Sequence, residues 1–170
     1  MLATALALSI GAISAFAQAS TKPAVGSPAP LISGQTQDGK AWKLADAAGK
    51  KVVLLYFYPK DDTPGCTKEA CGLRDRMSDL QKADVEVVGV SFDSAESHQK
   101  FIAKHNLNFT LLTDTDGKIA DAYGVRVPGK SVARRVSFLI GKDGKILHVT
   151  DAQSADTHLT EMSDAVAKLK

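Results

Sequence analysis

Two cysteines five residues apart are the side chains of this sequence best suited to chemistry. Cys66 and Cys71 are the only cysteines among its 170 residues. An apolar run at residues 51–58, KVVLLYFY, precedes them and predicts a buried strand. The turn PKDDTPG then leads into Cys66 and a helix-like sequence. The sequence therefore predicts a thiol at a helix N-terminus, where unpaired N–H groups and the helix dipole stabilise a thiolate.

Two residues of the turn could shape a small polar pocket over the Cys66 sulfur. Thr63 lies three residues upstream and can direct its hydroxyl towards the sulfur. Pro59 stiffens the start of the turn and restricts its neighbour. Both are candidate site residues.

The spacing of the cysteines makes a poor structural disulfide and a plausible redox pair. Cα atoms five residues apart in an ideal helix are roughly 8–9 Å from each other, whereas a disulfide needs about 4.4–6.8 Å. A bond between Cys66 and Cys71 would require local unwinding, which Gly72 makes easier by about 1 kcal/mol relative to alanine. The alternative is an inert pair of helix thiols. C-x-x-C is absent, and no histidine stands at zinc-ligand spacing from the pair.

The remaining sequence predicts an α/β domain of the thioredoxin-like class. Strands alternate with helices, which favours a central, mostly parallel sheet with flanking helices, an N-terminal β-hairpin and an antiparallel hairpin at the edge. The predicted strands are residues 31–33, 41–44, 51–58, 85–92, 109–113, 135–141 and 145–150. The predicted helices are residues 67–82, 94–106, 119–123 and 156–169.

The N-terminal residues differ in composition from the rest of the chain. Residues 1–19 carry no charge, are apolar over a short stretch, and end in two A-x-A sites, which is typical of a secretory signal peptide. The alternative is an uncleaved anchor. Residues 20–30 are rich in proline, serine and glycine and predict a linker, so the domain spans residues 31–170. We therefore expect an exported, periplasmic protein.

Overall charge and composition argue against several classes of partner. The chain has 21 Lys and Arg against 19 Asp and Glu, a net charge of +2, with no basic block. This balance does not support nucleic-acid binding or stable membrane insertion. His98, His105, His148 and His158 are too widely spaced to form a metal site, and Ser137 has no recognisable His/Asp arrangement for hydrolysis.

The sequence around Cys66 resembles the peroxiredoxins, and specifically the bacterioferritin comigratory protein, or PrxQ, subfamily. The family motif P-x-x-x-T-x-x-C falls on Pro59, Thr63 and Cys66. The position of the subfamily's resolving cysteine falls on Cys71. The family's catalytic arginine, two residues before an SFLI strand, matches Arg135. The similarity runs from about Val25 to the last helix.

This resemblance implies a thiol peroxidase that needs no metal or organic cofactor. Cys66 would attack a hydroperoxide and become a sulfenic acid, and Cys71 would condense with it to an intramolecular disulfide. A thioredoxin-like dithiol would then reduce the disulfide. Glu69 matches a family position that holds the arginine. Because the resolving cysteine is in the same chain, we expect a monomer.

Two questions stay open at the level of sequence. Arg134 and Arg135 point to opposite faces of a strand, so only one can face the site, and the family position favours Arg135. Two other functions compete with the peroxidase. One is a general thiol–disulfide oxidoreductase acting on exported proteins, and the other is a non-enzymatic holdase or structural domain.

Overall fold

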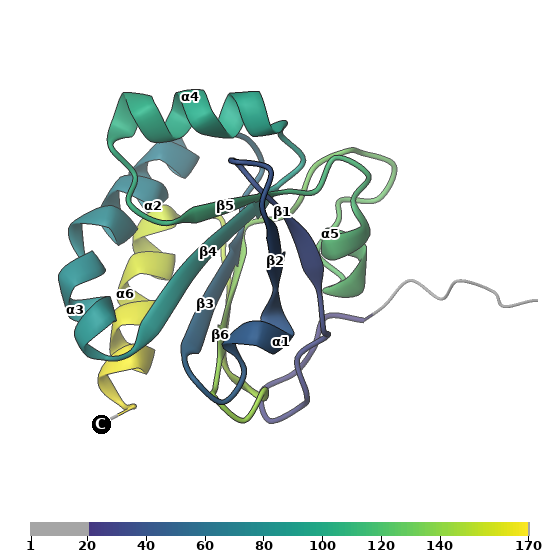
Figure 1. Ribbon diagram of the computed structural model, residues 1–170. Helices are drawn as coiled ribbons and strands as arrows, with labels where there is room; N and C mark the ends of the chain where they lie inside the picture. Colours follow the sequence, from purple (N-terminus) through teal and green to yellow (C-terminus); the bar gives the residue numbers. More distant parts are fainter. Residues whose placement is uncertain (1–20, 170) are drawn as a thin grey trace, which may run out of the picture.

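Strand β3 (Val52–Phe57) lies inside a seven-stranded sheet in the computed structural model, which describes residues 21–169 (Figure 1). All six of its side chains are buried, because helices cover both faces of the sheet. The strand order is β2-β1-β5-β4-β3-β6-β7. The other strands are β1 (Ser33–Thr36), β2 (Ala41–Lys43), β4 (Val85–Ser91), β5 (Thr110–Thr113), β6 (Val136–Ile140) and β7 (Ile146–Asp151).

The thioredoxin-like class is confirmed, but the sheet is mixed rather than mostly parallel. Only β3–β4 and β4–β5 are parallel pairs, and the remaining neighbours are antiparallel. A parallel pair needs a crossover that carries the chain back to the edge where the first strand began. The connection from β5 to β6 contains only the short helix α5 (Lys118–Ala122) and does not return the chain in this way. Strand β6 therefore runs antiparallel to β3.

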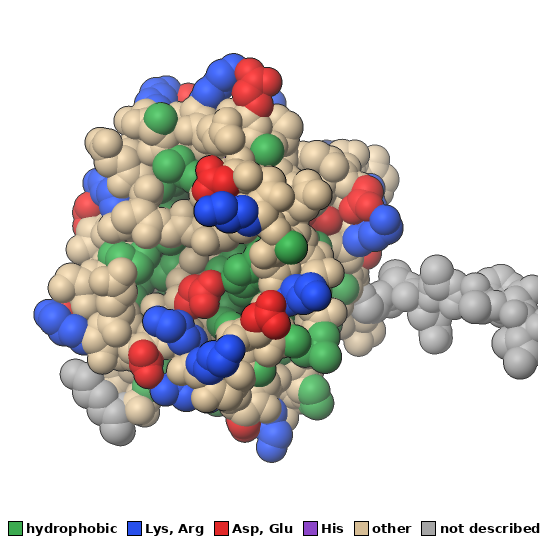
Figure 2. All heavy atoms as spheres, viewed as in Figure 1, with side chains coloured by type: hydrophobic (Ala, Val, Ile, Leu, Met, Phe, Trp, Pro, Cys, Tyr) green, Lys and Arg blue, Asp and Glu red, His purple; other side chains and the backbone are tan. Residues whose placement is uncertain are grey.

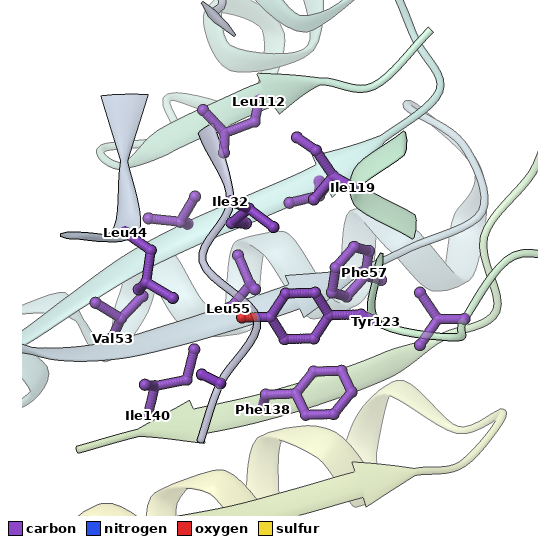
Figure 3. Close-up of a cluster of buried hydrophobic side chains, with 14 of the residues drawn as sticks. Ile32, Leu44, Val53, Leu55, Phe57, Leu112, Ile119, Tyr123, Phe138 and Ile140 are labelled. Atoms are coloured by element: carbon purple, nitrogen blue, oxygen red, sulfur yellow. The ribbon is translucent and has the colours of Figure 1, made fainter. Parts of the chain in front are cut away.

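Two apolar layers pack against the sheet, one on each face. Tyr56 and Tyr58 face the layer that also contains Cys66 and the inner faces of four helices. These helices are α2 (Pro64–Asp75), α3 (Met77–Lys82), α4 (Ala95–His105) and α6 (Ala155–Ala167). The alternate residues of β3 face the other layer, which Figure 3 shows. Side chains of α5 and of the short α1 (Leu44–Ala47) also belong to this layer. The catalytic candidates lie on the four-helix face.

The helix that follows Cys66 differs in two ways from the predicted helix at residues 67–82. It begins earlier, at Pro64, a residue suited to the first turn because its missing N–H is not needed there. It is also broken at Arg76, whose backbone φ of −94° and ψ of 0° separates α2 from α3. Leu73, Met77 and Leu80 are buried on both sides of the break, so the apolar spacing does not reveal it.

The first strand and the segment before it also differ from prediction. Leu31 is 76% exposed, and the first strand starts later, at Ser33. The segment predicted as a linker is bound to the domain over part of its length. Gly26 N donates to Ile146 O at 2.8 Å, and Ala29 N donates to Gly144 O at 2.8 Å. The predicted signal peptide lies outside the described residues.

The helices of residues 21–169 and the charges on one face of the molecule bear on possible partners. Across residues 21–169, the longest helices are too short and too polar to cross a bilayer. Figure 2 shows Lys and Arg side chains interspersed with Asp and Glu on the face in view. This face therefore lacks the extended field of one sign that tight binding to a polyanion would need.

Helix α2 packs closely on α6 at Gly72, and this contact can be tested by substitution. A Cβ at this position would lie 2.4 Å from Leu159 Cδ1, so Gly72→Ala should overpack the interface. Overpacking costs about 1–3 kcal/mol, and alanine recovers about 1 kcal/mol through its higher helix propensity. We expect a net fall in the free energy of unfolding of up to about 2 kcal/mol, measured by denaturant titration. The exposed Ser78→Ala is the control, and a more stable Gly72→Ala protein would contradict the packing argument.

Candidate active site

Cys66 is the third residue of α2 and is almost completely buried, with 2% of its surface exposed. Strand β3 ends nearby, and the loop at residues 58–63 carries the chain from the sheet into the helix. Thr63 is the N-cap residue and has extended backbone angles, while Pro64 starts the first turn. The sulfur is thus placed at the helix N-terminus, as the sequence predicts, where N–H groups and the helix dipole favour negative charge.

The loop before α2 is fixed by Asp61, a buried carboxylate that lies within hydrogen-bond distance of three side chains. Tyr58 OH donates at 2.7 Å, Ser97 Oγ at 2.7 Å, and His98 Nδ1 lies 2.9 Å away. Burial alone would raise the pKa of Asp61. The hydrogen bonds from His98, Tyr58 and Ser97 together outweigh it and hold the pKa below its ordinary value of 3.8. Asp61 therefore stays charged and ties the loop to α4.

Replacing Asp61 should loosen this loop and destabilise the fold. In Asp61→Asn a neutral amide replaces the carboxylate that accepts from Tyr58 and Ser97, and leaving buried hydrogen-bonding groups unsatisfied costs about 1–3 kcal/mol. Because the folded-state pKa is depressed, the stabilisation is present above pH 3.8 and is lost as the pH falls through the lower folded-state pKa. The difference in free energy of unfolding between wild type and Asp61→Asn should therefore shrink in strong acid. The neighbouring Asp62→Asn, at an exposed carboxylate, is the matched control; equal effects of both substitutions would argue against the loop contact.

Arg135 lies against both Cys66 and Glu69. Its Nη2 is 3.3 Å from Cys66 Sγ, its Nη1 donates to Glu69 Oε2, and its Nε donates to Gln153 O at 3.2 Å. Arg135 immediately precedes β6, which brings the guanidinium under the first turn of α2. Gly65 leaves room for it, since a Cβ there would lie 3.1 Å from Arg135 Nη2. A fixed positive charge therefore sits beside the sulfur.

The neighbouring Arg134 points away from the site. Its Nη1 donates to Asp151 Oδ2 at 3.1 Å and its Nη2 to Gly124 O at 3.1 Å. The two arginines thus lie on opposite sides of the chain, as strand alternation predicts. Arg135 is the one that meets Cys66.

Burial and charge act in opposite directions on the two groups beside the sulfur. Burial raises the pKa of Glu69 to about 7, although Arg135 acts to lower it. Burial also works against the charged form of Arg135, but Glu69 and Cys66 outweigh this and raise its pKa. Arg135 is therefore always charged, whereas Glu69 can change charge near neutral pH.

The structure gives less direct support to the other predicted site residues, Thr63, Pro59 and Cys71. Thr63 Oγ1 donates to Lys60 O at 3.1 Å, so its hydroxyl proton is used inside the loop rather than at the sulfur. Pro59 follows β3 at the start of that loop. Cys71 lies in the same helix as Cys66 and is partly exposed, and both thiols are free. The roles of these residues stay predictions.

The sequence reasoning missed two residues behind Arg135. His158 Nδ1 lies 2.7 Å from Ser137 Oγ and 3.5 Å from Glu69 Oε1, and all three side chains are buried. The only local signal was that Ser137 stands two residues after Arg135 in the strand pattern, which places it on the same face. Within residues 21–169, no group of three or more metal-ligating side chains is arranged to hold a metal ion.

Comparison with known proteins identifies the class to which this fold and site belong. The AhpC/TSA family model matches residues 25–149. A putative peroxiredoxin bcp of Coxiella burnetii is 47% identical over 144 residues, covering 81% of this chain and 95% of that protein. Peroxiredoxin Bcp of Escherichia coli K12 is 47% identical over 139 residues, covering 78% and 88%.

Solved structures agree with the sequence comparisons. BcpB of Mycobacterium tuberculosis superposes with a TM-score of 0.79 at 32% identity, covering 86% of this chain and 96% of that one. Peroxiredoxin Q of Xanthomonas campestris gives a TM-score of 0.75 at 31% identity, covering 82% and 92%. The chain belongs to the AhpC/TSA family of peroxiredoxins, in its Bcp/PrxQ branch. This membership supports a thiol peroxidase activity.

Proposed function

We propose that this protein reduces hydrogen peroxide and organic hydroperoxides with Cys66 as the peroxidatic cysteine and Cys71 as the resolving cysteine. The observation that carries the proposal is the contact between Arg135 Nη2 and Cys66 Sγ, 3.3 Å long, at the N-terminus of α2. A buried cation and the free N–H groups of a helix start together favour a thiolate. They also stabilise negative charge that develops on the leaving oxygen.

The first step converts the thiolate to a sulfenic acid. Cys66 Sγ attacks the terminal peroxide oxygen, the O–O bond breaks, and the departing alkoxide or hydroxide takes up one proton to leave as alcohol or water. Sulfur is oxidised by two electrons and the peroxide is reduced by two. Arg135 stabilises the negative charge first on the sulfur and then on the leaving oxygen.

The second step forms the Cys66–Cys71 disulfide. The Cys71 thiol attacks the sulfenic sulfur and water leaves, so the atoms balance without another reactant. Both cysteines lie in the continuous helix α2, where residues five apart are too distant for a disulfide. Resolution therefore requires α2 to unwind between them. The close packing of Gly72 on Leu159 would have to open in the same event.

An external dithiol completes the cycle in this proposal. A thioredoxin-like protein would reduce the disulfide by thiol–disulfide exchange and allow α2 to refold. The proposal needs one chain only, so a monomer suffices. Removal of residues 1–19 on export would place the enzyme in the periplasm, where an oxidising environment makes a dedicated reductant necessary.

The substrate range draws support from one relative. The bacterioferritin comigratory protein of Xanthomonas campestris, whose solved structure is 30% identical to this chain, is described as having alkyl peroxide reduction activity. An organic hydroperoxide is therefore a reasonable substrate to test beside hydrogen peroxide.

The direct test compares peroxide with a protein disulfide. Purified protein is supplied with a recycling dithiol, and the loss of hydrogen peroxide or cumene hydroperoxide is compared with the reduction of insulin disulfides. A peroxidase consumes peroxide far faster than it reduces insulin. Faster insulin reduction would favour a general thiol–disulfide oxidoreductase, and an unchanged thiol count after peroxide would favour a non-enzymatic role.

A further inference from the structure

A buried polar cluster lies behind the Cys66–Arg135 pair and takes no part in the steps above. It consists of Glu69 on α2, Ser137 on β6 and His158 on α6, each 1% exposed. Ser137 Oγ is 2.7 Å from His158 Nδ1, and Glu69 Oε1 is 3.5 Å from the same nitrogen. Through Glu69 Oε2 the cluster contacts Arg135, and through Arg135 it contacts the sulfur.

The direction of the hydrogen bonds leaves one oxygen without a donor. His158 Nε2 lies 2.9 Å from Ala152 O, and a carbonyl oxygen only accepts, so Nε2 carries a hydrogen. In the neutral imidazole Nδ1 is then an acceptor, and Ser137 donates to it. Glu69 Oε1 is buried and has no hydrogen-bond partner among residues 21–169. A proton on Oε1 would make it a donor towards Ser137 and Nδ1 and would complete a chain that ends at Ala152.

The charges of Cys66, Glu69 and Arg135 explain why Glu69 would be protonated. Arg135 is the cation in contact with both Cys66 and Glu69. If the sulfur is a thiolate and Glu69 is a carboxylate, two buried anions share this one guanidinium, and one negative charge is left uncompensated at high cost. Once the sulfur is oxidised to a neutral sulfenic acid, the carboxylate and Arg135 balance each other.

We propose that Glu69 holds a proton while Cys66 is a thiolate and releases it when the sulfur is oxidised, with Ser137 and His158 as the positioning residues that hold this proton in place. The proposal rests on the peroxidase function above. It also balances: oxidation of the thiolate leaves an alkoxide or hydroxide that takes up one proton, and Glu69 loses one. The first catalytic step then exchanges no net proton with solvent.

The charges around the cluster favour the carboxyl over the imidazole as the place for this proton. Glu69 faces Arg135, Ser137 and the buried phenol of Tyr56. His158 faces Arg135, and also Glu161 of α6 and Asp151 of β7, which favour its charged form. Burial nevertheless lowers the pKa of His158, while burial raises the pKa of Glu69 to about 7. Both shifts favour the carboxyl of Glu69 over the imidazole of His158 as the site of this proton.

Infrared difference spectroscopy on the full chain with Cys71→Ser tests the proposal. At neutral pH the reduced protein should show the carbonyl band of a protonated buried carboxyl. One equivalent of peroxide should remove it, and Glu69→Gln should lack it throughout.

Two further variants, at Ser137 and His158, should both shift the loss of the band to lower pH. In Ser137→Ala the protonated carboxyl of Glu69 loses the hydroxyl oxygen towards which it donates, so the band should disappear at lower pH. In His158→Leu the Ser137 hydroxyl loses its acceptor and turns to the carboxylate, so the band should disappear at lower pH. Each shift should be about one pH unit, the size of one hydrogen bond to a charged group. His148→Gln, at a partly exposed histidine on β7, is the matched control and should cause none.

The outcomes separate this proposal from the peroxidase function. A reduced protein without the band, or Ser137→Ala and His158→Leu proteins that titrate as His148→Gln does, would overturn the proposal while leaving peroxide consumption intact. If peroxide does not react with Cys66 at all, the peroxidase function fails instead. Alkylation of Cys66 with iodoacetamide removes the same thiolate charge, and loss of the band on alkylation would then still support the proton site.

Discussion

Replacing Cys66 by serine should abolish peroxide consumption. A serine hydroxyl at this position keeps the size of the side chain but is not ionised at neutral pH, so it offers neither a strong nucleophile nor an oxidisable atom. The loss of a catalytic nucleophile typically lowers the rate by about 10⁴-fold or more. We expect the residual rate of peroxide loss, followed with a recycling dithiol, to equal that of the buffer alone.

The matched control is the other cysteine. Cys71→Ser should oxidise at the wild-type rate for one turnover and then accumulate sulfenic acid at Cys66, because nothing in the chain can resolve it. The two variants therefore separate the oxidation step from the resolution step. Equal multiple-turnover activity in wild type and Cys66→Ser would remove Cys66 from the mechanism.

Replacing Arg135 by glutamine should slow the oxidation of Cys66 by about 100- to 1000-fold, the usual cost of losing one preorganised group that stabilises transition-state charge. The sulfur loses the guanidinium nitrogen that lies 3.3 Å away. Glu69 also loses the arginine that donates to its Oε2, so its carboxylate becomes harder to keep charged. The measurement is a single-turnover rate of thiol oxidation by stopped flow.

The neighbouring arginine supplies a matched control. Arg134→Gln removes the same positive charge one residue away but disturbs only contacts with Asp151 and Gly124, so its oxidation rate should stay within a few-fold of wild type. Because Arg135→Gln breaks a buried ion pair, its fold should be checked by circular dichroism. Arg135→Lys, which keeps the charge but not the planar fork, should fall between the two. Equal effects of Arg134→Gln and Arg135→Gln would contradict the assignment.

The sequence predicts the position of the sulfur well because that position depends on local signals. A strand of eight residues, a turn with proline and glycine, and a helix-forming run are all read from neighbouring residues. Alternation along a strand likewise predicts that Arg134 and Arg135 diverge. The structure places both arginines accordingly.

What the sequence could not predict depends on contacts between distant segments. The antiparallel direction of β6 follows from where the chain re-enters the sheet, which no local pattern encodes. The attachment of Gly26 and Ala29 to the β7 hairpin is likewise a tertiary contact. His158 and Glu69 are 89 positions apart in the sequence and meet only because α6 packs on α2. Thr63 shows that a local contact can also be missed. The sequence predicts that its hydroxyl points towards the Cys66 sulfur, but the hydroxyl donates to the carbonyl of Lys60.

We propose that Cys66 is oxidised and that Cys71 reaches it only after α2 unwinds. Mass spectrometry of the reduced protein treated with one equivalent of hydrogen peroxide tests this most directly. The account predicts a loss of two hydrogens per chain and a peptide linked through Cys66 and Cys71, with a fall in helical circular dichroism as the link forms. An unchanged mass, or a Cys66–Cys71 link that forms with the helix fully retained, would contradict it.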